Sequence, residues 1–335
     1  TAQSEGPLQR VYMCQASAEA LATSSSSTPT ACLLLGTIQR ERKDLRSGRK
    51  PKTSLSSTTN EEEYCTAARV HAIWQPRGAT TTSSDLSSSY NVNALLEYHT
   101  SKHVRRVAET LGLQPIGWIF QYPHDPNRHD NDGLPVQGPD VRAAAQLQIM
   151  AMQLVGRTEG ARFVTLAMDG TTGATEAFSL SDVAVQMTAE GILEDKDPSS
   201  PPQEGRFLKT NVPVVVDGKE THTVDSVLCL VNMALLSHKS GAYADGVASN
   251  VVKKKSGGLT KKTKKRLSSA LLANDDAALL ETLCSFSLLV ALTERLSTDE
   301  AEVLLETVRK FSRGQKKGTK LDMALKRKLG EVLEV

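Results

Sequence analysis

The stretch that decides the fold is LGLQPIGWIFQYP, residues 111–123. Immediately before it, residues 104–111 place apolar side chains at i, i+3, i+4 and i+7, which predicts one buried face of a helix. Gly112 follows the last of these residues, where a left-handed cap favours glycine. Pro115 cannot continue the helix, and the apolar, aromatic run 116–122 predicts a buried strand. The stretch therefore predicts a helix, a tight turn and a central strand.

The composition is that of a globular protein with an apolar core. The chain has 335 residues, enough for about two or three domains, and 39% of them are hydrophobic. The net charge of +2 selects no class of partner. Five scattered cysteines without a CxxC pair argue against a zinc ribbon or a disulfide scaffold and favour a reducing compartment. We expect no membrane span and no signal peptide. Because the chain starts at Thr1, we expect it to be part of a longer protein.

Residues 1–195 contain both expected strands and expected helices, and the family resemblance described below implies that they form an α+β domain with a mixed sheet flanked by helices. A charged, Ser/Thr-rich stretch near 40–65 has no periodicity and predicts a disordered insertion between two strands. His71 lies inside an expected strand, and we interpret it as a structural histidine rather than as a metal ligand. The expected strands are 8–14, 31–38, 67–74, 116–122, 162–168 and 175–178, and the expected helices are 93–111, 140–154 and 179–193.

The remaining residues predict three further parts. Residues 203–245 are expected to form a small β module. Within it, 224–236 is expected to be a buried strand or helix, and a strand is preferred for 226–235 because its apolar run is continuous. Residues 246–266 form a basic linker, and 267–335 a helical region. Within that region, Ser297 and Glu300 have the spacing of a capping box at a helix start. These helices are expected to form a bundle, to clamp the first domain, or to dock a partner.

The order strand, loop, strand, loop, helix, strand resembles the JAB/MPN fold of deubiquitinating metalloproteases. Those enzymes carry a strand that reads roughly GWYHSHP, and its two histidines, with an aspartate from the next loop, hold a catalytic zinc ion. Here Phe120 and Tyr122 stand at the histidine positions, Asp130 at the serine position and Gly133 at the aspartate position. The resemblance therefore implies a JAB/MPN-like pseudoenzyme without a metal or another cofactor.

Several blocks, in the same order, resemble the nuclear protein localization protein 4 family, which contains the MPN adaptor of the valosin-containing AAA unfoldase. The resemblance covers about residues 30–240, and the sequence departs from the family at Gln75-Pro76-Arg77 and in the long insertion. The blocks are CLLLGTI (32–38), VHAIWQP (70–76), LGLQPIGWIF (111–120), FVTL (163–166), EAFSLSD (176–182) and VPVVVDGKETHTVDSVLCLVNMALLSH (212–238).

This family resemblance implies a non-catalytic, ubiquitin-binding adaptor. Such an adaptor recruits polyubiquitinated substrates to the AAA unfoldase for unfolding and proteasomal degradation, together with a ubiquitin fusion degradation partner subunit. The resemblance implies that the protein is located in the cytoplasm and nucleus and at the surface of the endoplasmic reticulum. It also implies a role in the degradation of proteins from that organelle. The family's ubiquitin-like domain and zinc fingers are expected to precede Thr1. The alternative is an inactive MPN scaffold subunit of a lid-like or translation-initiation complex.

Two groups of residues are candidates for binding. Around the vestigial metal pocket, aromatic and amide side chains either fill the core or line a groove for an extended chain: Trp118, Phe120, Gln121 and Tyr122. The second group is a basic run that suits a nuclear import signal, an acidic partner or a solvated linker, and nucleic acid is disfavoured because no aromatic residue is interleaved. It comprises Lys253, Lys254, Lys255, Lys261, Lys262, Lys264, Lys265 and Arg266.

Overall fold

A computed structural model gives the fold of the chain. It describes residues 8–24, 30–42, 64–76, 90–122, 135–193, 205–238, 243, 259–315 and 318–333. Most of the expected insertion near 40–65, residues 43–63, lies outside this description, and its two ends belong to strands.

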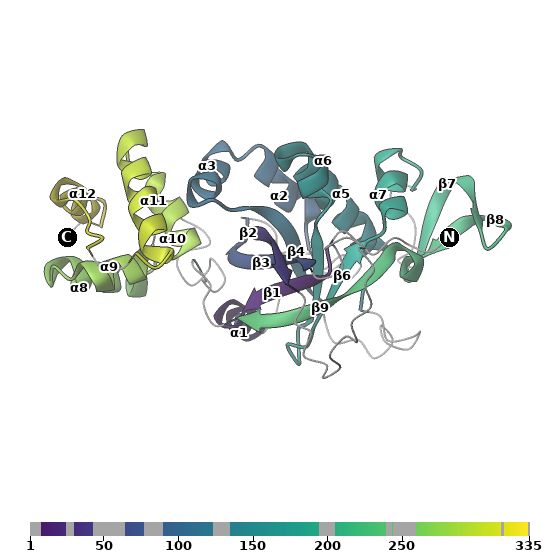
Figure 1. The fold of residues 1–335 in the computed structure, drawn as a ribbon, viewed down its shortest axis with the longest axis horizontal. Coiled ribbons are helices and arrows are strands. Elements are labelled where there is room, and N and C mark those ends of the chain that lie inside the picture. Colours follow the sequence, from purple (N-terminus) through teal and green to yellow (C-terminus); the bar gives the residue numbers. More distant parts are fainter. Residues whose placement is uncertain are drawn as a thin grey trace, which may run out of the picture.

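Seven of the described strands close into a mixed barrel (Figure 1). Their order is β1-β3-β2-β4-β5-β6-β9, and a parallel pairing of β9 with β1 closes the ring. The pairs β1–β3 and β4–β5 are also parallel, whereas the remaining pairs are antiparallel. The strands are β1 (Arg10–Cys14), β2 (Ala31–Arg42), β3 (Tyr64–Trp74), β4 (Gln114–Tyr122), β5 (Val164–Asp169), β6 (Thr175–Leu180) and β9 (Leu230–His238).

Helices cover the outside of this barrel and form a second lobe at the C-terminus (Figure 1). The hairpin of β7 (Phe207–Val216) and β8 (Lys219–Asp225) lies at the opposite end of the molecule. The helices on the barrel are α1 (Gln15–Ser24), α2 (Val92–Leu96), α3 (Lys102–Leu111), α5 (Gly138–Val155), α6 (Arg157–Gly160) and α7 (Asp182–Ala189), with the 3-10 turns η1 (Glu97–His99) and η2 (Ser226–Cys229). The C-terminal lobe contains α8 (Lys261–Leu272), α9 (Asp276–Leu283), α10 (Phe286–Thr293), α11 (Thr298–Ser312) and α12 (Met323–Leu333).

Strand β4 is covered on both faces, which explains its nearly continuous apolar sequence. Successive side chains of a strand point to opposite faces of the sheet. Trp118 and Phe120 therefore join the large core under the helices, whereas Ile119 joins a smaller core with Cys32 and Leu166. The two cores require apolar residues at both even and odd positions of the strand.

The predicted sequence of helix, tight turn and central strand at 111–123 is confirmed. Helix α3 ends at Leu111, and Gly112 adopts the left-handed conformation with a φ of 75°. Strand β4 starts two residues later, at Gln114. The capping box at the start of α11 is confirmed as well, because Glu300 accepts a hydrogen bond from the Ser297 backbone, 2.8 Å away, and Ser297 Oγ caps the Glu300 N–H.

Three predicted boundaries are wrong. Residues 203–245 are no separate module, because their last strand, β9, completes the barrel of the first domain. The expected strand 226–235 begins as the 3-10 turn η2, since the Asp225 side chain caps the N–H of Val227. The basic linker does not extend to residue 266, because Thr260 caps α8 and the helix starts at Lys261. The mixed α and β architecture is as predicted, and its JAB/MPN-like identity stays a prediction.

Among the described residues, no single helix is long and apolar enough to cross a membrane. The bent pair α9 and α10 passes a test of length and composition when taken together.

Candidate binding groove

The predicted vestigial pocket is filled by its own aromatic side chains. Trp118 and Phe120 are fully buried and stacked, with ring centroids 4.8 Å apart, and Tyr90 packs edge-on against Trp118. Trp118 Nε1 donates a hydrogen bond to Thr165 Oγ1, 3.0 Å away on β5, which satisfies the only polar atom of the indole side chain. Tyr122 is 3% exposed and completes the cluster. These rings therefore belong to the core.

Gln121 points to the other face of β4, as the alternation of a strand requires. Its Nε2 donates a hydrogen bond to the Leu21 backbone oxygen of α1, 2.8 Å away, and the residue is 2% exposed. Trp118, Phe120, Gln121 and Tyr122 thus fill the core and do not line a groove, because one face of β4 packs under helices and the other packs against residues of the neighbouring strands and of α1.

Phe120 and Tyr122, which the resemblance predicts to stand at zinc-ligand positions, carry no imidazole. Phe120 presents only carbon to the core, and Tyr122 is buried among aromatic rings. Asp130 and Gly133 lie outside the described residues. Nearby, the Tyr90 hydroxyl donates a hydrogen bond to Asp140 Oδ1 at the start of α5. Within the described ranges, no group of three His, Cys, Asp or Glu residues lies close enough to hold a metal ion.

The basic run is split by the structure. Lys253, Lys254 and Lys255 lie outside the described residues. The other five cations, which begin at Lys261 and end at Arg266, occupy the first turns of α8.

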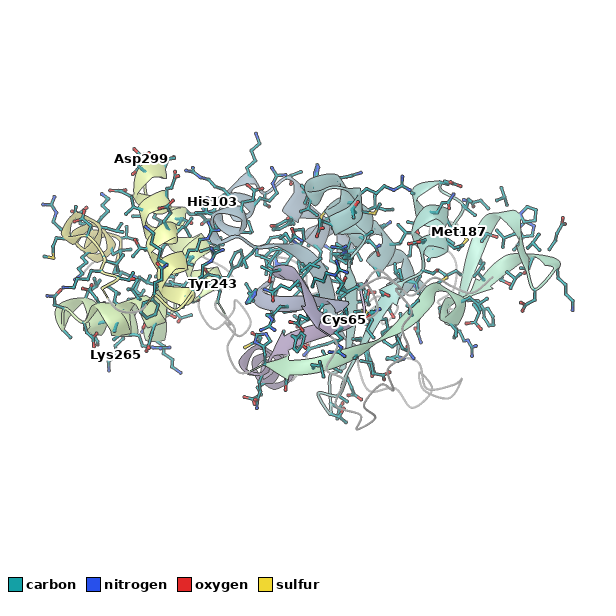
Figure 2. The ribbon with its side chains drawn as sticks, viewed as in Figure 1. Cys65, His103, Met187, Tyr243, Lys265 and Asp299 are labelled. Atoms are coloured by element: carbon teal, nitrogen blue, oxygen red, sulfur yellow. The ribbon has the colours of Figure 1, made fainter. Side chains whose placement is uncertain are left out.

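A groove that the sequence did not predict lies between the hairpin, α7 and the segment from η2 to β9. Its volume is about 590 Å³, and its walls are mostly apolar. Met187 of α7 lies on the side of that helix next to the hairpin (Figure 2). We call this feature the hairpin groove. Its main apolar lining comes from Val183, Met187, Val214, Val215, Leu228 and Val231.

The base of the hairpin is held by an ion pair that positions one wall of the groove. Arg206 contacts both carboxylate oxygens of Asp225, at 2.5 and 2.6 Å. Burial alone would raise the pKa of Asp225, but the hydrogen bonds from Arg206 and from the Val227 N–H, with the Arg206 charge, lower it overall. Because Asp225 also caps η2, one carboxylate links the hairpin to the turn that precedes β9.

Three apolar side chains that line the hairpin groove are largely exposed to solvent. Val215 is 70% exposed, Val183 62% and Leu228 50%. Apolar side chains gathered around a concave surface typically mark a binding site. The clue in the sequence is the run VPVVV at 212–216, where a hairpin with one solvated face would alternate polar and apolar residues. The groove is therefore suited to apolar side chains of a polypeptide.

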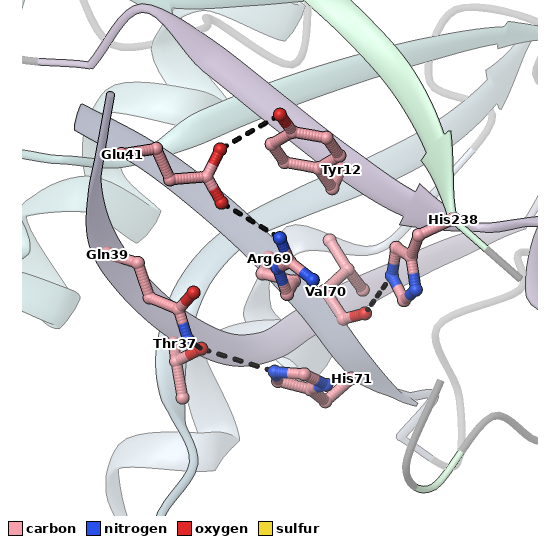
Figure 3. Close-up of polar contacts among 8 residues, drawn as sticks. All are labelled: Tyr12, Thr37, Gln39, Glu41, Arg69, Val70, His71 and His238. Atoms are coloured by element: carbon pink, nitrogen blue, oxygen red, sulfur yellow. Dashed lines mark hydrogen bonds and ion pairs between the residues drawn. The ribbon is translucent and has the colours of Figure 1, made fainter. Parts of the chain in front are cut away.

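A polar cluster on the barrel wall joins β1, β2 and β3 (Figure 3). Glu41 accepts hydrogen bonds from the Tyr12 hydroxyl, at 2.9 Å, and from Arg69 Nη2, at 2.8 Å. The Arg69 guanidinium also lies over the Tyr12 ring, 4.9 Å from its centroid. Burial acts to raise the pKa of Glu41, but the bonds from Arg69 and Tyr12 outweigh it and lower the pKa. These contacts tie three strands together.

His71 lies on the same barrel wall and contacts residues of two other strands. Its Nε2 is 3.2 Å from Thr37 Oγ1 on β2, and its ring is 6.3 Å from that of His238 on β9 (Figure 3). His238 Nε2 in turn lies 3.0 Å from the Val70 backbone oxygen. The geometry agrees with a structural histidine.

No protein-family model matches the sequence, and no curated protein matches it significantly.

Proposed function

We propose that the protein is a non-catalytic, ubiquitin-binding adaptor that recruits polyubiquitinated substrates to an AAA unfoldase for unfolding and proteasomal degradation. The observation that carries this proposal is the hairpin groove, an open apolar surface beside a strand. The blocks that resemble the nuclear protein localization protein 4 family supply the choice of ubiquitin as the ligand.

The groove has the properties that binding of an extended polypeptide requires. Strand β7 pairs with β8 on one side, and its second half, with Val214, Val215 and Val216, borders the groove. Pro213 lies in that half, as is usual for an edge strand. An added strand gains main-chain hydrogen bonds at such an edge and places alternate side chains in the apolar groove. Burial of the exposed valines contributes roughly 25 cal/mol for each Å² of apolar surface removed from water.

The aromatic core supports the non-catalytic part of the proposal. A metalloprotease of the JAB/MPN kind needs two imidazoles and a carboxylate around its zinc ion. Phe120 and Tyr122, which take the place of the imidazoles, are packed among other rings. We therefore propose a pseudoenzyme that binds without cleaving.

The proposed partners are polyubiquitin, the AAA unfoldase and the ubiquitin fusion degradation subunit. The proposed location is the cytoplasm and nucleus, including the surface of the endoplasmic reticulum, in the degradation of proteins from that organelle.

The experiment measures capture of polyubiquitin by the purified chain, alone and with the partner subunit and the unfoldase. Zinc content and ubiquitin cleavage are measured in the same samples. We expect capture without stoichiometric zinc or cleavage. The variant Val183→Asp/Val215→Asp is expected to weaken capture by about tenfold, because it places two charges in an apolar site. Val303→Asp, at an exposed valine of α11, is the matched control and is expected to leave capture unchanged. Cleavage, or equal capture by the groove variant and the control, contradicts the proposal.

A second function is favoured by the C-terminal lobe, in which α8 to α12 gather at one end of the molecule (Figure 1). Inactive MPN subunits of lid-like or translation-initiation complexes use such helices to join a common bundle. Under this alternative, the chain binds no ubiquitin and co-purifies with a large assembly from which deletion of α8 to α12 releases it.

A further inference from the structure

The outer side of the C-terminal lobe carries cations in an unfavourable place for helix stability. Lys261, Lys262, Lys265 and Arg266 are exposed in the first two turns of α8. The N-terminus of a helix bears a partial positive charge, so cations there are destabilising. In the part of the chain that the structure describes, none of these four side chains forms an ion pair. Their charges therefore remain available to an anionic partner.

An apolar groove lies at the C-terminal end of the same helix, α8. It lies between the end of α8 and the start of α12, with a volume of about 630 Å³. Leu272 of α8 is 78% exposed and Met323 of α12 is 70% exposed, and both line the groove. Lys326, which also lines the groove, anchors the start of α12. Its Nζ lies 2.8 Å from Asp276 Oδ1 and 2.8 Å from Asn274 Oδ1.

The charged and apolar parts lie on one ridge of α8. Lys261, Lys265, Ser268 and Leu272 follow one another at i, i+4, i+7 and i+11, which places them on the same face of the helix. Lys265 lies at the lower side of the lobe in the view of Figure 2. A ligand that lies along this ridge meets cations at one end and an apolar groove at the other.

We propose that the ridge of α8 and the groove beside α12 bind an acidic amphipathic helix of a partner protein. The cations fit carboxylates of such a helix, and Leu272 and Met323 fit its apolar face. A helix suits this site because a third helix packs into the groove between two others. Strand addition needs a sheet edge, and the described surface here consists of helices. Nucleic acid fits less well, because Leu272 and Met323 offer nothing to phosphates and no aromatic residue lines the groove.

The test uses fluorescence anisotropy with the full chain and a labelled helical peptide of roughly 20 residues, long enough to be helical in water. The peptide has leucines on one face and glutamates on the other. A peptide with lysine in place of glutamate, a peptide with serine in place of leucine, and a DNA duplex serve as comparison probes. We expect only the first peptide to bind tightly, and its affinity to fall as salt is added.

Two variants separate the charged part from the apolar part. Lys261→Glu/Lys265→Glu is expected to weaken binding of the acidic peptide by about tenfold or more through charge repulsion. Leu272→Ser/Met323→Ser is expected to weaken it by about fivefold through lost apolar contact. The matched controls, Lys102→Glu/Lys310→Glu and Val303→Ser, change exposed residues elsewhere and are expected to bind like the unaltered chain.

Circular dichroism is measured for each variant, and we expect all of them to be folded because the substituted side chains are exposed. Equal binding by the ridge variants and their controls overturns the proposal. Tighter binding of the DNA duplex than of the acidic peptide overturns it in favour of a nucleic-acid surface. Equal binding of the peptide that lacks leucine also overturns it, because the surface would then recognise negative charge alone.

Discussion

The side chain of Arg309 on α11 donates a hydrogen bond from Nη1 to the backbone oxygen of Thr110, 3.0 Å away on α3. Thr110 lies in the last turn of α3, where carbonyl groups have no partner within the helix and the helix dipole is negative. Arg309 and Arg313 also lie against Gly112, where an added Cβ would be 3.1 and 3.2 Å from their guanidinium groups. The C-terminal lobe is therefore attached to the turn that introduces the central strand.

Replacing Arg309 by methionine is expected to destabilise the protein by about 1–3 kcal/mol, because it removes a charged hydrogen-bond donor from a carbonyl at a helix end. Urea denaturation measures the loss, and hydrogen exchange is expected to rise in α3 and α11 together. Arg327→Met is the control, since the Arg327 side chain is 86% exposed. The same urea midpoint for both variants would show that Arg309 does not hold the lobes together.

The bond between Trp118 and Thr165 is expected to stabilise the aromatic core. Thr165→Val keeps the shape of the side chain but leaves the buried indole N–H without its acceptor, at a cost of about 1–3 kcal/mol. Trp118→Phe removes both the donor and ring volume. The double variant is expected to lose less stability than the sum of the two single variants, because the N–H is then absent. A double-mutant cycle in urea measures this coupling.

Thr307→Val serves as the control for that cycle, because its hydroxyl bonds within α11 at an exposed position. Strict additivity of the Trp118 and Thr165 losses would contradict a bond between them.

His71 is expected to make the barrel less stable in acid. Burial, with repulsion from His238 and Arg69, lowers the pKa of His71 from its ordinary value of 6.5 to about 4. Between these values the unfolded chain binds a proton that the folded chain does not, so stability falls as the pH drops from 6.5 to 4. We expect the urea midpoint of His71→Gln to fall less over this range than that of the unaltered chain.

NMR titration of the His71 ring checks the same prediction directly. A midpoint near 6.5 in the folded protein would contradict it, whatever the urea curves show. Carboxylates also titrate in this range, and the difference between the variant and the unaltered chain removes their contribution.

The cysteines are expected to differ in their reactivity with iodoacetamide. Burial raises the pKa of Cys32 to about 12, and burial with the Asp225 charge raises the pKa of Cys229 to about 12. The thiolate is the reactive form, so both should remain unlabelled in the folded protein. Cys284 is only half-buried and is expected to react first. Mass spectrometry of native and guanidinium-unfolded samples measures this order, and early labelling of Cys32 would contradict it.

Features that depend on neighbouring residues were predictable from the sequence. The end of α3, the left-handed Gly112 and the start of β4 follow from a helical spacing, a cap and a proline within a few residues. The capping box of α11 needed only Ser297 and Glu300. Such signals act over one helical turn, so they survive in almost any tertiary setting.

The candidate site could not be predicted in the same way. The four residues around the expected vestigial pocket are buried, and the open apolar surface lies instead between the hairpin and α7. Val215 and Phe120 are both apolar strand residues, yet one is 70% exposed and the other fully buried. Whether an apolar side chain becomes core or binding surface depends on which element packs over it, and this information is not in the local pattern.

The sequence by itself determined the local elements, their mixed α and β class and the absence of imidazole at Phe120 and Tyr122. Only the tertiary structure decided that β9 closes the barrel, because its parallel pairing places Val11 beside Leu235, residues far apart in the chain. It also decided that the basic run starts a helix whose ridge leads to Leu272. Local structure arises from nearby dihedral and capping preferences, whereas strand partners and exposed grooves arise from long-range packing of the whole chain.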